Sequence, residues 1–393
     1  MTTIELPHYV LKVLDTLKKA GHRGYAVGGC VRDALMGNTP GDYDVATDAT
    51  PERVRSLFEH TVPTGERFGT ITVIIDRNHV EVTTFRTESG YTDNRRPMLV
   101  AYGASLKDDL ARRDFTINAI AYCPDEGFID PYGGREDISL RAVRCVGKPD
   151  ERFGEDALRI LRGVRFCSTL GFEAESATLL AMIQNAPLLK NISMERIRDE
   201  VSRIIMTDRP DELNIILMAG GLSHLLLEPS QNLGRISRLP QIFEERMAGF
   251  LLLCSGSIVE SMQLLRLSRR EQQYISAVTA LVNKQMIADP IHLKRLLTKY
   301  EVEELLSAVR VKGALYDEEN MLECVEEIRR IEHSGEPYRV SHLEVNGTDI
   351  QKLDIVPPQK TGQVLNFLLG LCIGSPQLNE KEALLALAKS YSE

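Results

Sequence analysis

The chain has 393 residues, of which 43% are apolar and 26% are charged, and its formal net charge is −9 at pH 7. This length and composition are typical of about two or three domains with a sizeable core. A membrane protein is excluded, because the longest apolar run, residues 367–373, is far shorter than the roughly 20 residues of a spanning helix, and the N-terminus lacks a signal pattern. We therefore expect a cytoplasmic protein.

The cysteines and the charge restrict the function further. Seven cysteines, an odd number without a Cys-x-x-Cys pair, argue against a disulfide framework or a zinc site and favour buried thiols in a reducing compartment. The acidic net charge gives no overall attraction to nucleic acid. Any binding of nucleic acid must therefore use local basic patches.

The first expected helix covers residues 7–20. An apolar stripe formed by Val10, Leu14 and Leu17 runs along it, and Gly21 gives a stop signal. Because one face is apolar, we expect this helix to pack on a sheet.

A glycine turn between a short strand, residues 25–27, and a short helix, residues 30–36, is the first candidate site. Gly28 and Gly29 form this turn, and without side chains they let a ligand approach the backbone closely. A helix N-terminus has unpaired N–H groups and partial positive charge, so the turn suits a triphosphate, with Arg32 one turn along. The two glycines alone are a weak signal.

Two carboxylates, Asp42 and Asp44, follow the turn. Side chains alternate across a strand, so both would point to the same face and repel unless a cation neutralises them. Mg²⁺ suits this role, because it takes one or two carboxylates and completes its shell with phosphate and water. Asp-x-Asp alone is more often a solvated strand end. With twelve residues between Gly29 and Asp42, however, the spacing resembles the signature of the DNA polymerase β-like nucleotidyltransferase superfamily.

A helix and a hairpin come next. Thr50 and Pro51 suit the N-cap and the first position of a short helix. Residues 70–76 and 79–86 are rich in Val, Ile and Thr and are joined by a polar link, which indicates a β-hairpin. Glu81, on its second strand, would be a third carboxylate beside the Asp-x-Asp pair or a solvated strand residue.

Residues 87–100 are polar and fit neither the helical nor the strand period, with chain-breaking residues at Gly90, Asp93 and Pro97. We interpret this segment as a mobile loop. A long loop after a catalytic sheet is either a gate for the site or a plain surface loop.

Residues 110–122, interpreted as helical, carry a second group of polar side chains. Arg113, Asp114 and Asn118 supply a cation, an acceptor and a dual donor–acceptor, which suit a phosphate and a ribose hydroxyl. A helix with these residue types is more often simply exposed. A turn and a short strand around residues 143–146 would close this first domain.

The rest of the chain is mainly helical in pattern, and residues 151–168 are its most informative stretch. A helical wheel gives this stretch an apolar face and a polar face, the latter with Glu155, Asp156, Arg159, Arg162 and Gly163. The alternative is a salt-bridged surface helix, because Glu155 and Arg159 form a favourable i,i+4 pair.

The motifs together resemble those of the class II tRNA nucleotidyltransferases, the CCA-adding enzymes. They are, in order, VGGCVRD, GDYDVAT, FRTESGYTDNRRP, RRDFTINAIAY, DPYGG and EDALRILRGVRF, followed by SMERIRDEVSRII, LEVNGTDIQKL and LLALAKSYSE. The resemblance spans nearly the whole chain and implies an α+β fold. A nucleotidyltransferase head with a mixed or antiparallel sheet and helices would be followed by an all-α neck, body and tail. The expected bounds are 1–148 for the head, 149–205 for the neck with its base-reading helix, 206–330 for the body and 331–393 for the tail.

The resemblance and the residues together give the candidate site. Asp42 and Asp44 would be catalytic and would hold Mg²⁺, with Glu81 as a candidate third carboxylate. The expected nucleotide-binding residues are Gly28, Gly29, Arg32, Arg113, Asp114, Asn118, Glu155, Asp156, Arg159, Arg162 and Arg165. Among them, the resemblance assigns Asp156 and Arg159 to the base. Arg165 lies off the reading face of the wheel, so either the helix ends near it or it contacts phosphate from the side.

The implied activity is template-independent addition of C, C and A to the 3′ end of tRNA from CTP and ATP. Two metal ions at Asp42 and Asp44 would activate the terminal 3′-hydroxyl and stabilise the leaving pyrophosphate during in-line attack. C and A carry an amino group on the Watson–Crick edge where U and G carry a carbonyl. Asp156 could accept a hydrogen bond only from the amino group, and this would select C and A.

Four alternatives stay open. An A-adding enzyme shares these motifs, whereas a CC-adding enzyme usually lacks the loop at residues 87–100. A bacterial poly(A) polymerase shares the head but usually has a basic C-terminal extension, which SYSE lacks. A catalytically silent RNA-binding protein could keep the fold, but the intact Asp42, Asp44 and Arg113 weigh against this alternative. The implied partners are tRNA, contacted mainly through the backbone of its acceptor and TΨC half, with CTP and ATP and no membrane, and a homodimer is an open option.

Overall fold

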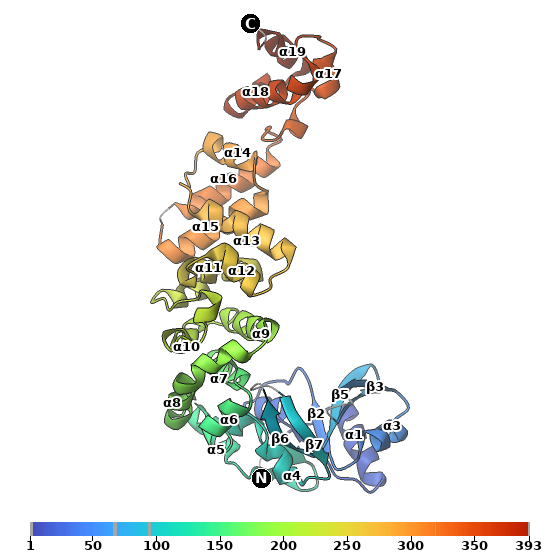
Figure 1. The fold of residues 1–393 in the computed structure, drawn as a ribbon. Coiled ribbons are helices and arrows are strands. Elements are labelled where there is room, and N and C mark those ends of the chain that lie inside the picture. The colour runs from blue at the N-terminus through green and yellow to red at the C-terminus, as the bar shows by residue number, and fades with distance from the viewer. Residues whose placement is uncertain (1–2, 66–68, 93–95, 319, 392–393) are drawn as a thin grey trace. The chain divides into compact units, whose positions relative to one another are not determined.

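The computed structural model contains two compact units (Figure 1). It describes residues 3–65, 69–92, 96–318 and 320–391. The units are residues 1–231 with 264–266, and residues 232–263 with 267–393. The first contains a mixed sheet with helices and the second is helical, so the predicted α+β fold is confirmed. The four-part division into head, neck, body and tail stays a prediction.

The first unit is built on a sheet of seven strands. In spatial order they are β3 (Thr61–Gly65), β4 (Thr70–Ile75), β5 (Asn78–Thr84), β2 (Asp44–Thr47), β1 (Gly24–Val27), β8 (Ala121–Cys123) and β9 (Gly127–Ile129). Neighbouring strands are antiparallel except β2 and β5, which are parallel. The predicted strand at residues 25–27 and the predicted hairpin are confirmed as β1 and the β4–β5 pair.

Helices cover both faces of this sheet. On one face lie α1 (His8–Lys19), α2 (Gly29–Leu35) and α3 (Pro51–Leu57), and on the other lies α4 (Leu106–Ala111). Alternation along the strands sends Ala26 and Val45 to the first face and Tyr25 and Ala46 to the second. The predicted packing of the first helix on the sheet is confirmed.

Residues 87–100, predicted as a mobile loop, belong instead to a β-hairpin. Its strands, β6 (Arg86–Thr92) and β7 (Arg96–Tyr102), pair antiparallel and form a separate two-stranded sheet. The prediction was wrong because it looked for alternating polar and apolar residues. A two-stranded ribbon needs no such alternation, since its backbone hydrogen bonds hold the two strands together. Residues 93–95, between the strands, lie outside the described residues.

Residues 110–122 were interpreted as helical, but the structure does not form one helix there. The helix α4 ends at Ala111, and an extended residue, Phe115, and a short 3-10 turn separate it from β8. The Asp114 carboxylate gives the reason. Its Oδ1 accepts hydrogen bonds from the N–H of Phe115 at 2.9 Å and from the Asn118 amide at 3.1 Å, and these local bonds compete with a helix.

Residues 151–168 form two helices rather than one. They are α6 (Pro149–Glu155) and α7 (Leu158–Leu170), interrupted at Asp156, whose φ of −140° and ψ of 101° are not helical. The Asp156 Oδ1 accepts a hydrogen bond from the N–H of Leu158 at 3.1 Å, which gives the backbone an alternative to the helical pattern. A single helical wheel therefore does not apply across this break.

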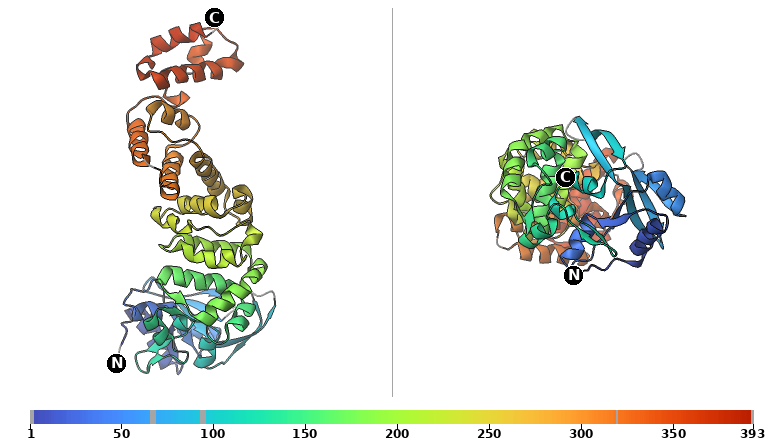
Figure 2. Two further views of the ribbon diagram at one scale, coloured as in Figure 1. Left: turned by 90° about the vertical axis from the view of Figure 1, so that its left-hand side faces the viewer. Right: turned by 90° about the horizontal axis from the view of Figure 1, so that it is seen from below.

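The remaining elements of the first unit are α5 (Gly134–Leu140), α8 (Ser176–Asn185), α9 (Met194–Ile205), α10 (Asn214–Met218) and a two-stranded parallel sheet of β10 (Ala142–Val143) and β11 (Glu173–Ala174). The later helices are α11 (Phe243–Cys254), α12 (Ile258–Leu264), α13 (Arg269–Val282), α14 (Pro290–Leu297), α15 (Val302–Tyr316), α16 (Met321–His333), α17 (Gly347–Gln351), α18 (Thr361–Gly374) and α19 (Lys381–Ser390), drawn from yellow to red in Figure 2.

Buried side chains of two kinds hold the second unit together. An apolar cluster that includes Ile350, Leu368 and Leu384 joins the last three helices. Nearer its start, the fully buried Glu245 accepts hydrogen bonds from Ser307 and Arg310. This pairing satisfies a carboxylate that would otherwise be costly to bury.

All seven cysteines lie among the described residues, and each is buried with a free thiol. This confirms the prediction of buried thiols. No helix in the described ranges is long and apolar enough to cross a membrane.

Candidate active site

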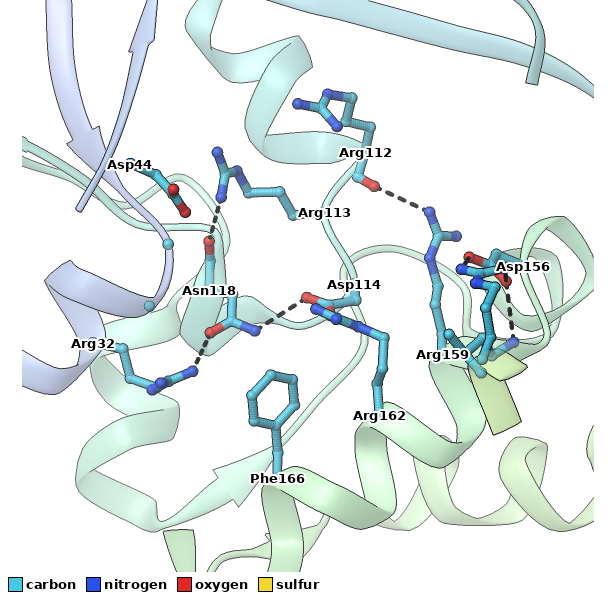
Figure 3. Close-up of a pocket in the computed structure, with 14 residues that line it drawn as sticks. Arg32, Asp44, Arg112, Arg113, Asp114, Asn118, Asp156, Arg159, Arg162 and Phe166 are labelled. Atoms are coloured by element: carbon cyan, nitrogen blue, oxygen red, sulfur yellow. Dashed lines mark hydrogen bonds and ion pairs between the residues drawn. The ribbon is translucent and has the colours of Figure 1, made fainter. Parts of the chain in front are cut away.

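A cavity of about 430 Å³ in the first unit brings together most of the predicted site residues (Figure 3). Of these, it is lined by Gly28, Gly29, Arg32, Asp44, Arg113, Asp114, Asn118, Asp156, Arg159 and Arg162. The sequence did not single out four other residues that line it, Arg112, Leu158, Phe166 and Arg196. Asp42, Glu81, Glu155 and Arg165 do not line it.

The glycine turn forms one side of the cavity as predicted. Gly28 has a φ of +77°, and a Cβ at this position would come within 2.8 Å of Arg113 Nη1 and 3.8 Å of Asp44 Oδ2. Glycine is therefore required both by the backbone and by the close approach of two site residues. Arg32 follows one turn along α2, and its Nη1 donates to Asn118 Oδ1 at 2.7 Å.

Asp44 is the first residue of β2 and lies directly opposite Glu81 of the parallel strand β5. Glu81 is exposed, so the register puts it next to Asp44 but does not decide between a third carboxylate and a solvated strand residue. Asp42 is exposed and precedes the strand, so the alternation argument does not apply to it. The pKa of Asp44 is raised to about 6, mainly by burial and to a smaller extent by the charges of Glu81 and Asp42, while the Arg113 guanidinium opposes this rise.

The residues around Asp44 fit a hard cation. The charges of Glu81 and Asp42 both act on Asp44 and are opposed there by one guanidinium, that of Arg113, so a cation at Asp44 would be favoured. No group of three or more His, Cys, Asp or Glu side chains in the described part of the chain is arranged to hold a metal ion. An ion at Asp44 would therefore need phosphate and water oxygens to complete its shell, as Mg²⁺ usually does.

The Asp114 carboxylate accepts hydrogen bonds from residues on different elements around the cavity. Its Oδ2 accepts from Arg162 Nε at 2.8 Å and Nη2 at 2.5 Å, while its Oδ1 is held by the bonds from Phe115 and Asn118. Burial alone would raise the pKa of Asp114, but the Arg162 guanidinium and these hydrogen bonds hold it well below its usual range. Asp114 is therefore ionised at neutral pH.

The expected Glu155–Arg159 pair is present, across the break between α6 and α7. Arg159 Nη1 lies 2.7 Å from Glu155 Oε2, and the same carboxylate also accepts from Arg152. Arg159 further donates to the backbone oxygens of Arg152 at 2.9 Å and Arg112 at 3.2 Å. With 7% of its surface exposed, Arg159 is held in one orientation at the cavity wall.

Asp156 has a partner that the sequence did not reveal. Arg196 of α9 donates to its carboxylate, and both residues line the cavity. The signal that could have found Arg196 is its place in SMERIRDEVSRII, a motif already noted for its resemblance.

Arg165 does not join this group. The helix α7 continues past it to Leu170, and its Nε donates to the buried Glu200 at 2.6 Å. Of the two options for Arg165, an early helix end is therefore wrong. Gly163, expected on the polar face, is buried, and a Cβ there would meet the Phe115 ring at 3.0 Å.

Comparison with known proteins identifies the family. Residues 24–144 match the family described as "Poly A polymerase head domain", and residues 171–232 match the family "Probable RNA and SrmB- binding site of polymerase A". The CCA-adding enzyme of Streptococcus gordonii is 35% identical over 391 residues, which is 96% of this chain and 96% of that protein. The CCA-adding enzyme of Bacillus subtilis is 49% identical over 195 residues, 50% of this chain and 49% of its own length.

A solved structure agrees with these relatives. The Bacillus stearothermophilus CCA-adding enzyme in complex with CTP has a TM-score of 0.82 to this chain at 31% identity, covering 98% of this chain and 96% of that one. Similarity of sequence and of fold thus extends over nearly the whole length. The chain belongs to the class II tRNA nucleotidyltransferases, the family of the CCA-adding enzymes.

Proposed function

We propose that this protein adds C, C and A, without a template, to the 3′ end of tRNA from CTP and ATP. The observation that carries the proposal is the make-up of one cavity, which has an acidic edge at Asp44, several guanidinium groups and the Asp156–Arg159 pair. These parts suit a cation, a triphosphate and a base read by side chains. Relatives named as CCA-adding enzymes match nearly the whole chain, which supports the same reading.

The triphosphate is assigned to the glycine turn and the arginines beside it. Gly29 begins α2, whose N-terminal N–H groups favour an anion, and Arg32 and Arg113 supply positive charge from two sides. The contacts of Arg113 are both long, a hydrogen bond of 3.4 Å from Nη1 to the backbone oxygen of Asn118 and an ion pair of 3.5 Å from Nη2 to Asp109. The ribose is assigned to Asp114, whose carboxylate is kept ionised and fixed by Arg162.

The choice of base is assigned to Asp156 and Arg159. A carboxylate accepts from the amino group of C or A but is left as an unpaired, desolvated acceptor against the carbonyl of U or G, which costs about 1–3 kcal/mol. Arg159, oriented by Glu155, would donate to the ring nitrogen or carbonyl next to that amino group. No nucleic-acid template is needed, because the protein supplies the complementary edge.

Family members usually need a divalent metal, and we propose Mg²⁺ at Asp44 and Asp42. When bound, it would supply charge stabilisation at the reacting phosphate and a lower pKa for the attacking 3′-hydroxyl. Glu81 is proposed to act on this site through its charge, because it lies opposite Asp44 in the strand register, although the three carboxylates do not form a ready metal-holding group. The protein residues themselves fix the nucleotide and exclude the wrong base.

The test is an extension assay with three tRNA substrates, one lacking the last three nucleotides, one ending in C and one ending in CC. Each is incubated with purified protein, a divalent cation and one labelled nucleotide at a time. We expect CTP to extend the first two, ATP to extend only the third, and extension to stop after A. The Asp44→Ala protein is the matched inactive control.

Other outcomes separate the alternatives. ATP addition to tRNA ending in CC without any CTP addition would identify an A-adding enzyme, and CTP addition alone a CC-adding enzyme. Repeated ATP addition would identify a poly(A) polymerase, whose head domain family also matches this chain. Binding of tRNA without any extension would identify a catalytically inactive RNA-binding protein that has kept the family fold.

A further inference from the structure

The aromatic ring of Phe166 has three arginines around it. The guanidinium carbons of Arg32, Arg162 and Arg165 lie 5.3, 5.7 and 4.2 Å from the ring centroid. All three distances are within the range of a cation–π contact, about 6 Å. Figure 3 shows the ring between Arg32 and Arg162 at the edge of the cavity, so one ring serves arginines from α2 and from α7.

The ring itself is held rigidly. Phe166 is 5% exposed, and its ring meets that of Phe115 edge to face, with the centroids 5.7 Å apart and the planes at 82°. Phe115 is fully buried and follows Asp114 directly in the chain. The position of Phe166 is therefore fixed relative to the backbone that carries the Asp114 carboxylate.

Each arginine also has a polar anchor. Arg32 donates to Asn118 and is paired with the neighbouring Asp33, Arg162 donates to Asp114, and Arg165 donates to Glu200. Three like charges around one ring nevertheless repel one another. The negative face of the ring offsets part of this repulsion and gives all three groups a common contact.

We propose that Phe166 is a positioning residue that holds Arg32 and Arg162 in place for the triphosphate of the incoming nucleotide. This inference rests on the proposed function, because it assumes that the cavity takes CTP and ATP. Phe166 has no charge and no hydrogen-bonding group, so it acts through the arginines. Both arginines line the cavity, while Arg165 completes the ring contact outside it.

The proposal predicts an effect on phosphate affinity that is the same for every base. In the Phe166→Leu protein, which keeps apolar volume but loses the ring, KM for CTP and for ATP should both rise by about 5- to 30-fold, the loss expected for cation–π contacts to two arginines. The ratio of CTP to UTP use should stay unchanged. The affinity for inorganic pyrophosphate, measured by calorimetry with a divalent cation present, should fall by a similar factor.

Two further variants separate positioning from folding. Phe166→Tyr keeps the ring and should keep KM and pyrophosphate affinity close to those of the wild type. Phe172→Leu is the matched control, because Phe172 is 2% exposed and has Arg141 6.0 Å from its ring centroid but does not line the cavity. Phe172→Leu should lower the melting temperature, as we also expect of Phe166→Leu, but it should leave KM unchanged.

The result that would overturn the proposal is an unchanged pyrophosphate affinity in Phe166→Leu, or an equal loss in Phe166→Leu and Phe172→Leu. If Phe166→Leu does not fold, Phe166→Met takes its place with the same expected loss, and an affinity equal to that of the wild type would again overturn the proposal. The calorimetry needs no turnover. A wild-type protein that binds pyrophosphate but does not extend tRNA would therefore overturn the proposed function and still leave the comparison of variants decisive for Phe166.

Discussion

Arg196 contacts Asp156 with two nitrogens, Nη2 2.9 Å from Oδ2 and Nη1 3.3 Å from Oδ1. The N–H of Leu158 donates to the same Oδ1 at 3.1 Å. A carboxylate has about four acceptor positions, so these three bonds leave about one for a nucleobase. Asp156 is thus held in one orientation, and under the proposed function the remaining acceptor position is the one that would take a base amino group.

The first prediction follows from that arrangement and concerns the choice of base. Asp156→Ala removes both the attraction for an amino group and the penalty for a carbonyl, so incorporation of UTP and GTP should rise relative to CTP and ATP by about 5- to 150-fold. Single-turnover transfer of each nucleotide measures it. Asp44→Ala is the contrast, because it should lower all four rates together. An unchanged preference at a lower overall rate would leave Asp156 as a structural salt-bridge residue.

The second prediction concerns the acidic edge. Asp44→Ala should lower the single-turnover rate by more than about 100-fold, because it removes a group that organises charge at the reacting phosphate, while tRNA affinity should stay near that of the wild type. Glu81→Gln should lower the rate less, since Glu81 is the strand partner of Asp44 but does not line the cavity. Filter binding and primer extension in parallel measure both effects. Near wild-type extension by Asp44→Ala would contradict the assignment.

The third prediction concerns Gly28. An alanine there meets both an unfavourable φ and Arg113 Nη1, so Gly28→Ala should destabilise the fold by about 1–3 kcal/mol and also raise KM for CTP. Gly37 is the control, because its φ of +78° is similar but a Cβ would have nothing within 4 Å. Gly37→Ala should lose stability and keep KM. Equal KM values in the two variants would show that displacement of Arg113 has no effect on the nucleotide.

The fourth prediction concerns pH and Asp114. Its pKa is held below the usual range, so it stabilises the fold above its unfolded pKa of about 4, and this stabilisation is lost as the pH falls below that value. Asp114→Asn should therefore cost about 1.5–3 kcal/mol of unfolding free energy at pH 7, and the difference from the wild type should shrink below about pH 4. Urea unfolding at pH 7, 4 and 2.5 measures it.

The control for this prediction is Asp199→Asn. Asp199 pairs with Arg198 on the exposed surface, where ion pairs contribute little. Its substitution should leave the unfolding free energy nearly unchanged over the whole pH range. A constant difference between Asp114→Asn and the wild type from pH 7 to 2.5 would mean that Asp114 stabilises the fold by packing rather than by charge.

The fifth prediction concerns the β6–β7 hairpin. Arg86 lies opposite Tyr102 in its register, so a short glycine linker can join these ends when residues 88–100 are removed. The hairpin forms its own sheet, and its loss should leave the seven-stranded sheet intact. Following the family resemblance, the shortened protein should still add two C residues and lose the final A. Addition of A to tRNA ending in CC by a folded deletion protein would exclude this role.

Local signals in the sequence were sufficient for several elements. Thr50 caps α3 as predicted, with its side chain accepting from the N–H of Arg53, and Pro51 is the first residue of that helix. The stripe of Val10, Leu14 and Leu17 is buried against the sheet. These features depend on residues within one or two turns of each other, so a single sequence contains all the information they need.

The rest required contacts between distant parts of the chain. The predicted helix at residues 151–168 failed because the Asp156 side chain is held by Leu158 on one side and by Arg196, forty residues away, on the other. Phe166 reads as a plain core residue, and only the fold brings Arg32 to its ring. The sequence left open whether Glu81 lies near Asp44, because the parallel register of these two strands depends on the whole sheet.

The seven buried cysteines provide an internal reporter of how the chain opens. Cys30, Cys123, Cys145 and Cys167 lie in the first unit and Cys254, Cys324 and Cys372 in the second, and none is accessible in the folded state. A thiol reagent can therefore react only after local or global unfolding exposes a site. Pulse labelling followed by peptide mass spectrometry would then give a separate opening rate for each unit in the native sequence, without any introduced label.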